Sequence, residues 1–378
     1  MRILYVVNQM ARGGVEIQLR DRAAALVRRG HTVAVVSMMR FLDFEQSLED
    51  AGVETAALGL DDRWSAPRAL VRFAGVLRRF RPDVVHSHLF WATLFARTVR
   101  VIPPAFRGPW RVLVCSSHAQ KEESSSRYVA YRLTSPLGDA WTSVTREGIA
   151  VHEAHGAIAP GTARWTPNGV DIGRYRQDDT ARTEAREELA VGNAFVWLAL
   201  GSFRDETKDY STMLDAMARV SGQSLLLIGG EGRLLEEKRA LANRLGIAQR
   251  VRFLGLRSDV ERLLQAADGY VLSSQTEAMP NVLLQASASA LPVVTTDVGE
   301  ASAIVEDGRG GVVVPRRNPQ RLADAMRHVE TLDPSTRRRM GEVGRARVAE
   351  QFDFDRVVNR WVALYEELLA AKGGVAGE

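Results

Sequence analysis

Residues 269–286 read GYVLSSQTEAMPNVLLQA. The first four residues form a short apolar run of the kind found in buried strands, and a polar loop follows them. Pro280 is expected at the first position of a helix, where its missing amide costs nothing. Glu277 then lies in the loop, and Gln285 lies on the body of the helix. The segment therefore predicts a strand, a loop and a helix in direct succession.

The same alternation of strand and helix continues along the chain in both directions, as in parallel sheets with crossover helices. In the first half, the expected strands are Arg2–Val7, Thr32–Ser37, Val84–His86, Arg111–Cys115, Trp141–Val144 and Ala163–Thr166. In the second half they are Phe195–Leu200, Ser224–Ile228, Val251–Phe253, Gly269–Leu272, Pro292–Thr295 and Gly311–Val314. The series predicts an α/β protein.

Two such series predict two doubly wound, Rossmann-like domains that face each other across a cleft, with a ligand at the carboxyl ends of the strands. The polar stretch 178–188 separates the series and is expected to be the linker. An apolar helical stretch over residues 357–369 follows no strand of its own. We expect it to pack back on the first domain. The predicted domains are 1–177, completed by helix 357–372, and 189–356.

The composition excludes several classes of protein. The chain has 378 residues, of which 46% are hydrophobic and 25% charged, as in soluble globular proteins and unlike disordered or coiled-coil chains. A single cysteine, Cys115, excludes an internal disulfide. The apolar run at residues 3–7 is too short for a signal peptide, and no run approaches the ~18 residues of a membrane-spanning helix. We expect a cytoplasmic protein.

The positive charge is concentrated in the first half of the chain. Residues 1–177 carry a net charge of +8 and the remainder −4, for a total of +4. A basic domain favours an anionic partner such as a membrane surface. Nucleic acid is not expected, because no helix-turn-helix, zinc-finger or stacking-aromatic motif is present. Residues 67–82 form a basic amphipathic stretch, with Arg68, Arg72 and Arg79 on one side, that could lie on anionic lipid. An ordinary solvated arginine face is the alternative.

A pair of glycines follows the first expected strand, in Arg12-Gly13-Gly14-Val15-Glu16. Glycines let the backbone approach a ligand, and the free amides of a helix start favour an anion such as a diphosphate. A simple tight turn is the alternative. The sequence is not the Gly-x-Gly-x-x-Gly fingerprint of dinucleotide-binding proteins, so the main evidence for a dehydrogenase is missing.

The loop and helix start within residues 269–286 offer a second anion site. Around Pro280, which has no N–H of its own, the backbone amides of Met279, Asn281 and Val282 gather near the Glu277 carboxylate. This combination suits a sugar diphosphate, because amides bind phosphate and a carboxylate accepts hydrogen bonds from sugar hydroxyls.

The run 276–286 and the following ALPVVTTDVG at residues 290–299 resemble the signature of glycosyltransferase family 4, which comprises retaining enzymes of the GT-B fold. Further segments similar to that family stand in the right order and cover nearly the whole chain. They are GGVE at 13–16, PDVVHSH at 82–88, PNGVD at 167–171, KDY at 208–210, GGEG at 229–232 and FLG at 253–255.

The resemblance implies that Gly13 and Gly14 face the diphosphate of a nucleotide-sugar donor and that Lys208 neutralises it. It also implies that Gly255 belongs to the donor-binding set. Where the family usually has an arginine, this chain has Phe203, and Arg204 comes one residue later as a displaced ligand of the diphosphate. A solvated loop is the alternative for Lys208 and Arg204.

His118 follows an expected strand at a place where the family often has a histidine near the donor sugar. Together with Glu277 it would position the sugar, although a purely structural histidine is the alternative. His86 and His88 alternate along a strand as metal ligands can, but a third ligand is not visible, and a structural role is favoured. The family needs no metal and no cofactor, and Asp353-Phe354-Asp355 is interpreted as a helix cap.

This chain departs from the family at two positions. The family has a second glutamate, eight positions after the first, that binds the ribose hydroxyls, and Gln285 stands there instead. An amide has a single acceptor oxygen, so we expect nucleotide binding to weaken by ~1 kcal/mol or to be rearranged. Ala278 replaces the usual glycine.

The sequence as a whole predicts a retaining, metal-independent hexosyltransferase. Its donor is expected to be a nucleotide-diphosphate sugar, UDP-linked, and its acceptor a lipid-linked glycan of bacterial surface polysaccharide assembly at the inner face of the plasma membrane. One alternative is the same enzyme class acting on a soluble natural product. The other, suggested by Gln285, is a non-catalytic scaffold of the same fold that binds a nucleotide sugar.

Overall fold

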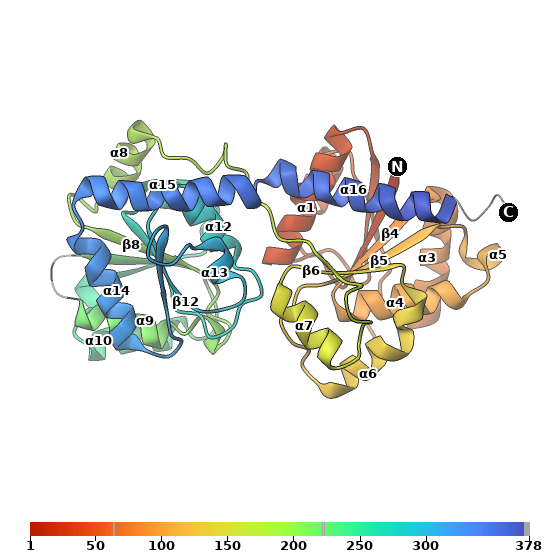
Figure 1. Ribbon diagram of the computed structural model, residues 1–378, viewed down its shortest axis with the longest axis horizontal. Coiled ribbons are helices and arrows are strands. Elements are labelled where there is room, and N and C mark those ends of the chain that lie inside the picture. The colour runs from red at the N-terminus through yellow and green to blue at the C-terminus, as the bar shows by residue number, and fades with distance from the viewer. Residues whose placement is uncertain (63–64, 221, 223, 374–378) are drawn as a thin grey trace. The chain divides into compact units, whose positions relative to one another are not determined.

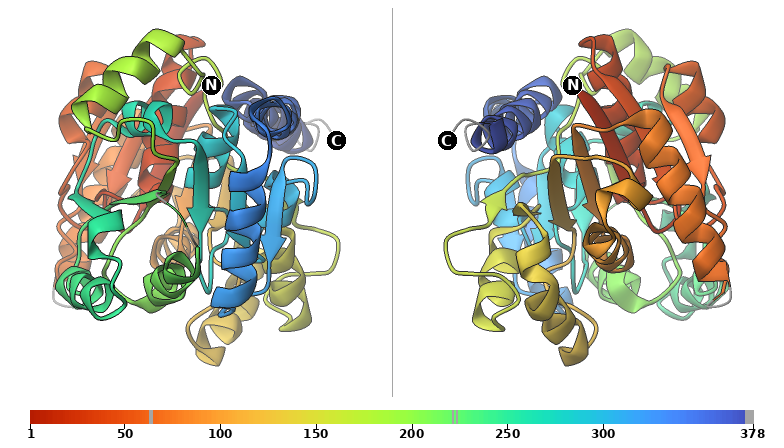
Figure 2. Two further views of the ribbon diagram at one scale, coloured as in Figure 1. Left: turned by 90° about the vertical axis from the view of Figure 1, so that its left-hand side faces the viewer. Right: turned by 90° about the vertical axis from the view of Figure 1, so that its right-hand side faces the viewer.

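A computed structural model of the protein describes residues 1–62, 65–220, 222 and 224–373. The chain forms two compact units (Figure 1). Unit 1 comprises Met1–Asn168 together with the chain from Arg356 onward, and unit 2 comprises Gly169–Asp355. Figure 2 shows the strands and flanking helices in two further views. Each unit is a parallel sheet flanked by helices.

Unit 1 contains, within the described residues, a seven-stranded parallel sheet in the order β3-β2-β1-β4-β5-β6-β7. Its strands are β1 (Arg2–Val7), β2 (Thr32–Ser37), β3 (Glu54–Ala57), β4 (Val84–His88), β5 (Val112–Ser117), β6 (Ala140–Ser143) and β7 (Arg164–Trp165). Its helices are α1 (Gly14–Arg28), α2 (Glu45–Asp50), α3 (Ala66–Phe80), α4 (Phe90–Val101), α5 (Pro104–Arg107), α6 (Ser125–Thr134), η2 (Ser135–Leu137), α7 (Arg146–Ala154) and α16 (Phe354–Gly373).

Side chains alternate between the two faces of this sheet, as in any strand. Leu4, Val85 and Leu113 lie on the face covered by α3, α4 and α6, in one core cluster with Phe73 and Tyr131. The opposite face, which includes Tyr5, His86 and His88, packs against α1 and α16. This second face carries polar side chains deep in the unit.

Unit 2 has the strand order β10-β9-β8-β11-β12-β13, again counted over the described part of the chain. Its strands are β8 (Val196–Leu200), β9 (Leu225–Gly229), β10 (Val251–Gly255), β11 (Gly269–Leu272), β12 (Val293–Thr296) and β13 (Gly311–Val314). Its helices are α8 (Asp179–Glu188), η3 (Glu206–Lys208), α9 (Tyr210–Arg219), α10 (Leu235–Arg244), η4 (Ala248–Arg250), α11 (Val260–Ala266), α12 (Asn281–Ala288), α13 (Ala301–Ile304), α14 (Pro319–Thr331) and α15 (Pro334–Gln351).

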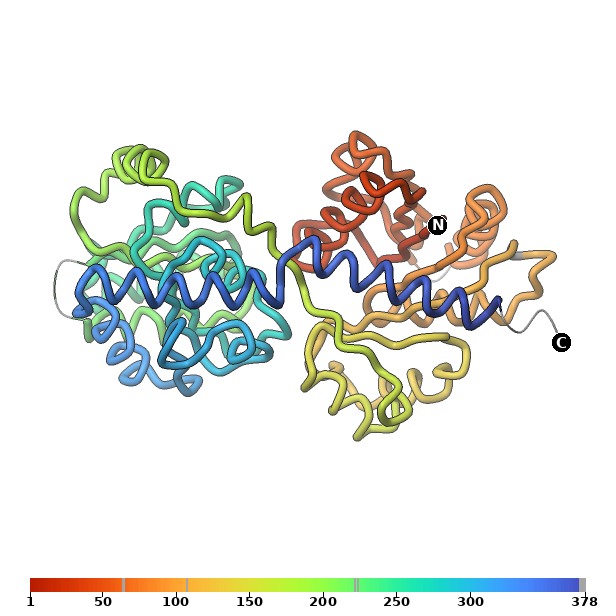
Figure 3. Tube along the Cα trace, turned by 45° about the horizontal axis from the view of Figure 1, so that its top comes forward, coloured from red at the N-terminus to blue at the C-terminus, as the bar shows by residue number. Residues whose placement is uncertain are grey.

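The C-terminal helix α16 packs on the N-terminal strands of unit 1, far from it in sequence (Figure 3). The Tyr365 hydroxyl lies 3.3 Å from that of Tyr5, and the Lys372 ammonium lies 2.9 Å from the Asp139 carboxylate. Trp361 is 2% exposed. None of the helices in the described ranges has the length and apolar character needed to cross a bilayer.

The structure corrects the expected linker. Residues 179–188 form helix α8, which belongs to unit 2, and Asp178 caps it by accepting a hydrogen bond from the amide of Ala181. Arg182 and Arg186 both bind the carboxylate of Asp268, and Ala185 is buried. The polar composition of this stretch therefore belongs to a capped surface helix.

The structure also corrects the predicted start of the helix. Pro280 was predicted to be its first residue, but it occupies the cap position with extended backbone angles, and α12 begins at Asn281. The edge strand β3 and the short helix α2 were not predicted.

Candidate active site

The strand orders place the sequence-predicted residues at the switch point of each sheet. In unit 1, β1 and β4 are neighbours, and the chain leaves them in opposite directions along the sheet. In unit 2, β8 and β11 have the same relation. Doubly wound sheets bind ligands at such points, outside the carboxyl ends of the strands. Gly13 follows β1, Lys208 follows β8 and Glu277 follows β11.

Lys208 and Glu277 form an ion pair in unit 2. The hydroxyl of Ser274 donates a second hydrogen bond to the same carboxylate oxygen, at 2.9 Å. The side chains of Lys208 and Glu277 are only 20% and 15% exposed. Two residues 69 positions apart, which the sequence assigned to one donor, therefore lie in direct contact.

The loop that carries Lys208 is held by the end of β11. The Ser273 hydroxyl donates to the carbonyls of Lys208 and Asp209, at 2.8 and 2.9 Å. The amide of Gln275 donates to the Thr207 carbonyl at 2.8 Å. Asp209 has a φ of +47° and caps α9. These bonds fix the position of the Lys208 backbone relative to Glu277.

Lys238 supports the same loop and was not singled out in the sequence. Its ammonium lies 2.5 Å from Glu206, 2.9 Å from Glu237 and 3.0 Å from the Ser211 hydroxyl, and its side chain is 2% exposed. Burial lowers the pKa of Lys238, but the hydrogen bonds to both glutamates outweigh it, so that the pKa is raised overall. Glu237 is adjacent to Lys238, but Ser211 and Glu206 are 27 and 32 residues away, so this set of partners leaves no local sequence pattern.

Phe203 and Arg204 differ in their surroundings. Phe203 is fully buried and stacks on Tyr210 with ring centroids 4.2 Å apart, which explains why an arginine is not found there. The Arg204 side chain is exposed, and its carbonyl accepts a hydrogen bond from Arg233 at 2.6 Å. Arg233 is thus a second guanidinium beside the predicted diphosphate ligand.

Gly230 and Gly232 lie in the loop after β9. Because neither has a side chain, this loop packs directly against the backbone of residues 201–204. A Cβ on Gly230 would lie 1.9 Å from the Gly201 carbonyl oxygen, and one on Gly232 would lie 2.3 Å from the carbonyl carbon of Phe203. Gly255 has a φ of +67°, and its carbonyl accepts from the amide of Gly230 at 2.8 Å. Gly255 therefore lies beside this glycine loop.

The loop before α12 is fixed by a glycine from another element. Gly299 has a φ of +48°, and a Cβ there would lie 2.1 Å from the carbonyl oxygen of Ala278. The amide of Glu300 donates to that same carbonyl at 3.0 Å. Met279 and Pro280 are buried in this loop, whereas Asn281 and Val282 are half-buried at the start of α12.

Gln285 lies one turn further along α12 and is half-buried. Its side-chain amide donates to the hydroxyl of Tyr175, at 2.9 Å. Arg345 in turn donates to the carbonyls of Tyr175 and Ile172, at 2.7 and 2.9 Å. The residue that replaces the family's glutamate therefore has a defined partner, which the sequence did not indicate.

In unit 1, Gly13 is the cap of α1 and Gly14 its first residue. The Glu16 carboxylate lies against Gly13, because a Cβ there would be 2.3 Å from its Oε2. Arg12 forms an ion pair of 3.0 Å with Asp43.

His118 directly follows β5 and is half-buried. Its Nε2 lies 2.8 Å from Nδ1 of His88, which in turn lies beside Arg22. Burial, followed by the charge of Arg22, lowers the pKa of His118 to about 3. The structure thus places His118 and His88 in contact.

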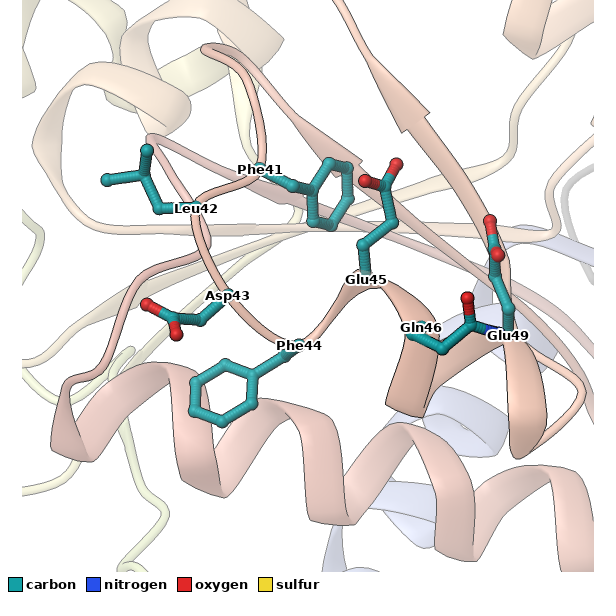
Figure 4. Close-up of a pocket in the computed structure, with 7 residues that line it drawn as sticks. All are labelled: Phe41, Leu42, Asp43, Phe44, Glu45, Gln46 and Glu49. Atoms are coloured by element: carbon teal, nitrogen blue, oxygen red, sulfur yellow. The ribbon is translucent and has the colours of Figure 1, made fainter.

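A hollow on the surface of unit 1 is lined by none of the sequence-predicted site residues (Figure 4). The lining comes from the loop before α2 and from α2 itself. It consists of Phe41, Leu42, Asp43, Phe44, Glu45, Gln46 and Glu49. Three carboxylates disfavour binding of a diphosphate here. Over the described ranges, no group of three or more His, Cys, Asp or Glu side chains is placed to hold a metal ion.

Comparisons with known proteins match both units. Residues 12–174 match the model of Glycosyltransferase Family 4, and residues 194–331 match that of Glycosyl transferases group 1. A D-inositol 3-phosphate glycosyltransferase of Geodermatophilus obscurus is 31% identical over 315 residues, covering 76% of this chain and 68% of that protein. A GDP-mannose-dependent alpha-(1-6)-phosphatidylinositol monomannoside mannosyltransferase of Mycobacterium tuberculosis is 28% identical over 379 residues, covering 94% and 95%.

Among solved structures, Anabaena HepE in complex with UDP superimposes with a TM-score of 0.86 at 21% identity, covering 97% of this chain and all of that one. This likeness shows the GT-B fold. Together with the identity to the Geodermatophilus enzyme and the two matched halves, it establishes that this chain is a glycosyltransferase of family 4.

Proposed function

We propose that this chain transfers a hexose, with retention of the anomeric configuration, from a UDP-linked sugar to a lipid-linked glycan of a bacterial surface polysaccharide. The observation that carries the proposal is the contact of Lys208 with Glu277 at the switch point of unit 2. We assign the Lys208 cation to the diphosphate and the neighbouring Glu277 carboxylate to the sugar hydroxyls.

The chemistry follows from these groups. The bond between the anomeric carbon and the diphosphate oxygen breaks, and the diphosphate keeps the electron pair. An acceptor hydroxyl attacks from the same face and passes its proton to the departing phosphate oxygen. The charge that develops on the diphosphate is stabilised by Lys208 and Arg204 and by the backbone at Gly13 and Gly14, so no metal is required. Glu277 and His118 hold the sugar.

The nucleotide is assigned to UDP because HepE, which shares the fold, was solved with UDP. The mycobacterial relative is named as GDP-mannose-dependent. The donor is therefore the first matter to test. We expect thermal stabilisation of the chain by UDP and by a UDP-hexose, and less by GDP or ADP at equal concentration. Stronger stabilisation by GDP-mannose would overturn the UDP assignment.

The lipid-linked acceptor is supported by charge and by exposed apolar side chains in unit 1. The name of the mycobacterial relative describes a phosphatidylinositol mannoside acceptor. Here Val71 on α3, Val101 on α4 and Phe106 on α5 are 69%, 66% and 69% exposed. Helices α3 and α5 contact each other, and Arg78 of α3 donates to the Phe106 carbonyl at 2.6 Å. We propose that this basic and apolar surface rests on anionic lipid at the inner face of the plasma membrane.

Measurements of turnover distinguish an active glycosyltransferase from a non-catalytic scaffold. The purified chain should release UDP from a UDP-hexose slowly in water and faster with a lipid-linked glycan acceptor. Glu277→Gln, which keeps the size of the side chain, should bind UDP as the native chain does and lose turnover. Nucleotide binding without release of the sugar under all these conditions would support the scaffold alternative. Equal turnover on soluble acceptors would support a natural-product substrate.

A further inference from the structure

A chain of buried hydrogen bonds leads to His118 from the interior of unit 1. A terminal nitrogen of Arg22 on α1 lies 3.1 Å from Nε2 of His88, on β4. Nδ1 of His88 lies 2.8 Å from Nε2 of His118, after β5. Arg22 is 7% exposed, His88 is fully buried and His118 is half-buried. His118 is thus the outermost residue of this series of hydrogen bonds.

Arg22 occupies an unusual position for a charged group. Its guanidinium lies 4.6 Å from the ring centroid of Trp361 and 5.2 Å from that of Tyr5. Among the described residues it forms no ion pair with a carboxylate, and its Nε has no hydrogen-bond partner. Burial of a guanidinium without a counter-ion is costly, so its bond to His88 calls for a reason beyond stability.

The direction of each hydrogen bond follows from the chemistry of Arg22. A guanidinium keeps its proton in proteins and can only donate. Nε2 of His88 must therefore accept, which leaves the proton of neutral His88 on Nδ1. That Nδ1 faces Nε2 of His118 and donates to it. Neutral His118 then carries its own proton on Nδ1, and within the described chain this Nδ1 has no hydrogen-bond partner.

We propose that Arg22 and His88 are positioning residues that hold His118 as the neutral tautomer protonated on Nδ1, so that it donates a hydrogen bond to an oxygen of the bound nucleotide sugar. The identity of that oxygen rests on the proposed function, whereas the tautomer does not. His118 in this state is a permanent donor and not a general base. Each bond in the chain polarises the next, which strengthens the outermost donor.

The charges around His118 support its neutral state. Burial is the largest cause that lowers its pKa, and Arg22 on α1 is the next. The pKa of His88 is lowered well below its usual value by burial, and then by His86, Arg22 and His118. Tyr5 on β1 and Trp361 on α16 lie against the guanidinium of Arg22, and neither carries a carboxylate. His118 therefore remains neutral across the ordinary working range of pH.

His86 provides a matched control. It is equally buried on the same strand, but its hydrogen bonds go to the Tyr365 hydroxyl at 2.7 Å and the Ser116 hydroxyl at 2.6 Å. A substitution there disturbs the same core without removing the bond to His118.

The test reads the tautomer directly. Nitrogen-15 NMR of histidine-labelled full-length chain, assigned with single histidine variants, should show His118 protonated on Nδ1, unprotonated on Nε2 and unchanged from pH 5 to 8. His88→Gln keeps an acceptor for Arg22 and a donor for His118, so the tautomer and most of the turnover should survive. His88→Leu should release His118 to the other tautomer and lower kcat at least about tenfold, with little change in KM, which is the cost of about one hydrogen bond.

His86→Leu should leave the His118 spectrum unchanged even if it lowers the melting temperature. A native His118 protonated on Nε2, or a His88→Leu variant as active as His88→Gln, would overturn the proposal. The predicted spectrum in a chain that turns over no nucleotide sugar would refute the proposed function while leaving the positioning role intact.

Discussion

Lys208 is paired with Glu277, and we expect the diphosphate of a bound donor to compete for the same ammonium. Lys208→Ala should raise the donor Kd about 10- to 100-fold, because a charge-assisted hydrogen bond contributes about 1.5–3 kcal/mol. It should also lower kcat, since the charge on the leaving group grows in the transition state. Calorimetry and steady-state kinetics measure the two effects.

Lys121→Ala is the matched control, because Lys121 is exposed in unit 1 and has no place in the predicted site. Equal kinetics for the two alanine variants, with both chains folded, would remove Lys208 from the site.

Gln285 gives a second prediction for a single residue. Its amide now donates to the Tyr175 hydroxyl, which can reverse and donate to a carboxylate instead. Gln285→Glu should therefore be accommodated and leave one oxygen for the ribose. We expect nucleotide binding about fivefold tighter, from about 1 kcal/mol. The gain should vanish with a 2′-deoxy nucleotide, as measured by calorimetry.

Tyr175→Phe combined with Gln285→Glu removes the hydroxyl that stabilises the carboxylate, and this double variant should bind less tightly than Gln285→Glu alone. If the gain ignores the 2′-hydroxyl, or if Gln285→Glu binds more weakly than the native chain, Gln285 does not face the ribose.

We predict that helix α3 binds anionic lipid through its arginine face. Its buried residues are Ala69, Phe73, Val76, Leu77 and Phe80, so its arginines lie on the outer face. Arg72 donates to the Leu58 carbonyl at 3.0 Å and Arg79 lies 3.9 Å from Glu54, yet both stay exposed. Binding to anionic vesicles should fall steeply with salt and be lost when Arg68, Arg72 and Arg79 are replaced by glutamine.

The control for α3 removes the same charge elsewhere. Arg244, Arg338 and Arg339 are exposed residues of unit 2, and their replacement by glutamine should leave vesicle sedimentation unchanged. Equal losses in both triple variants would mean that net charge alone drives binding, and salt-independent binding would exclude the α3 surface.

Elements with strong apolar periodicity were predictable, and those shaped by distant partners were not. The bounds of β1, β2, β11 and β13 were predicted to the residue, because each is a buried β-branched or apolar run. Strand β3 was missed, since Glu54–Ala57 is half polar and lies at the sheet edge. Helix α8 was mistaken for a linker because its stability comes from Asp178 and Asp268, outside the helix.

The candidate site shows the same division. Lys208 and Glu277 could be named from local motifs, and the structure brings them together. Lys238 and Tyr175 act through contacts 32 and 110 residues away, and Arg22 reaches His88 across 66 residues. Such contacts depend on the order of strands in the sheet, which periodicity along the chain does not determine.

At the scale of the whole molecule, the buried histidines predict an acid-sensitive fold. His86, His88 and His118 all have pKa values lowered below 6.5, chiefly by burial. Below pH 6.5 the unfolded chain binds protons that the folded chain does not, so the free energy of unfolding falls as the pH falls. Each histidine contributes about 1.4 kcal/mol per pH unit until its folded-state pKa is reached.

Denaturant unfolding at pH 7.5, 6.5 and 5.5 measures this slope for unit 1. His118→Asn removes one of the three groups and should reduce the loss of stability between pH 6.5 and 5.5 by about 1 kcal/mol. A native stability that does not change between pH 6.5 and 5.5 would contradict the neutral state of these side chains.

The return of α16 to unit 1 determines when that unit can be completed during translation. Residues 1–168 leave the ribosome well before Trp361 and Tyr365, which cover Arg22 and His86. At roughly 5–20 residues per second, the nascent sheet waits roughly 10 to 40 s for them with its histidine face uncovered. Unit 2, although synthesised second, is the first that can finish folding, and a chain released before residue 361 leaves unit 1 open to chaperones and proteases.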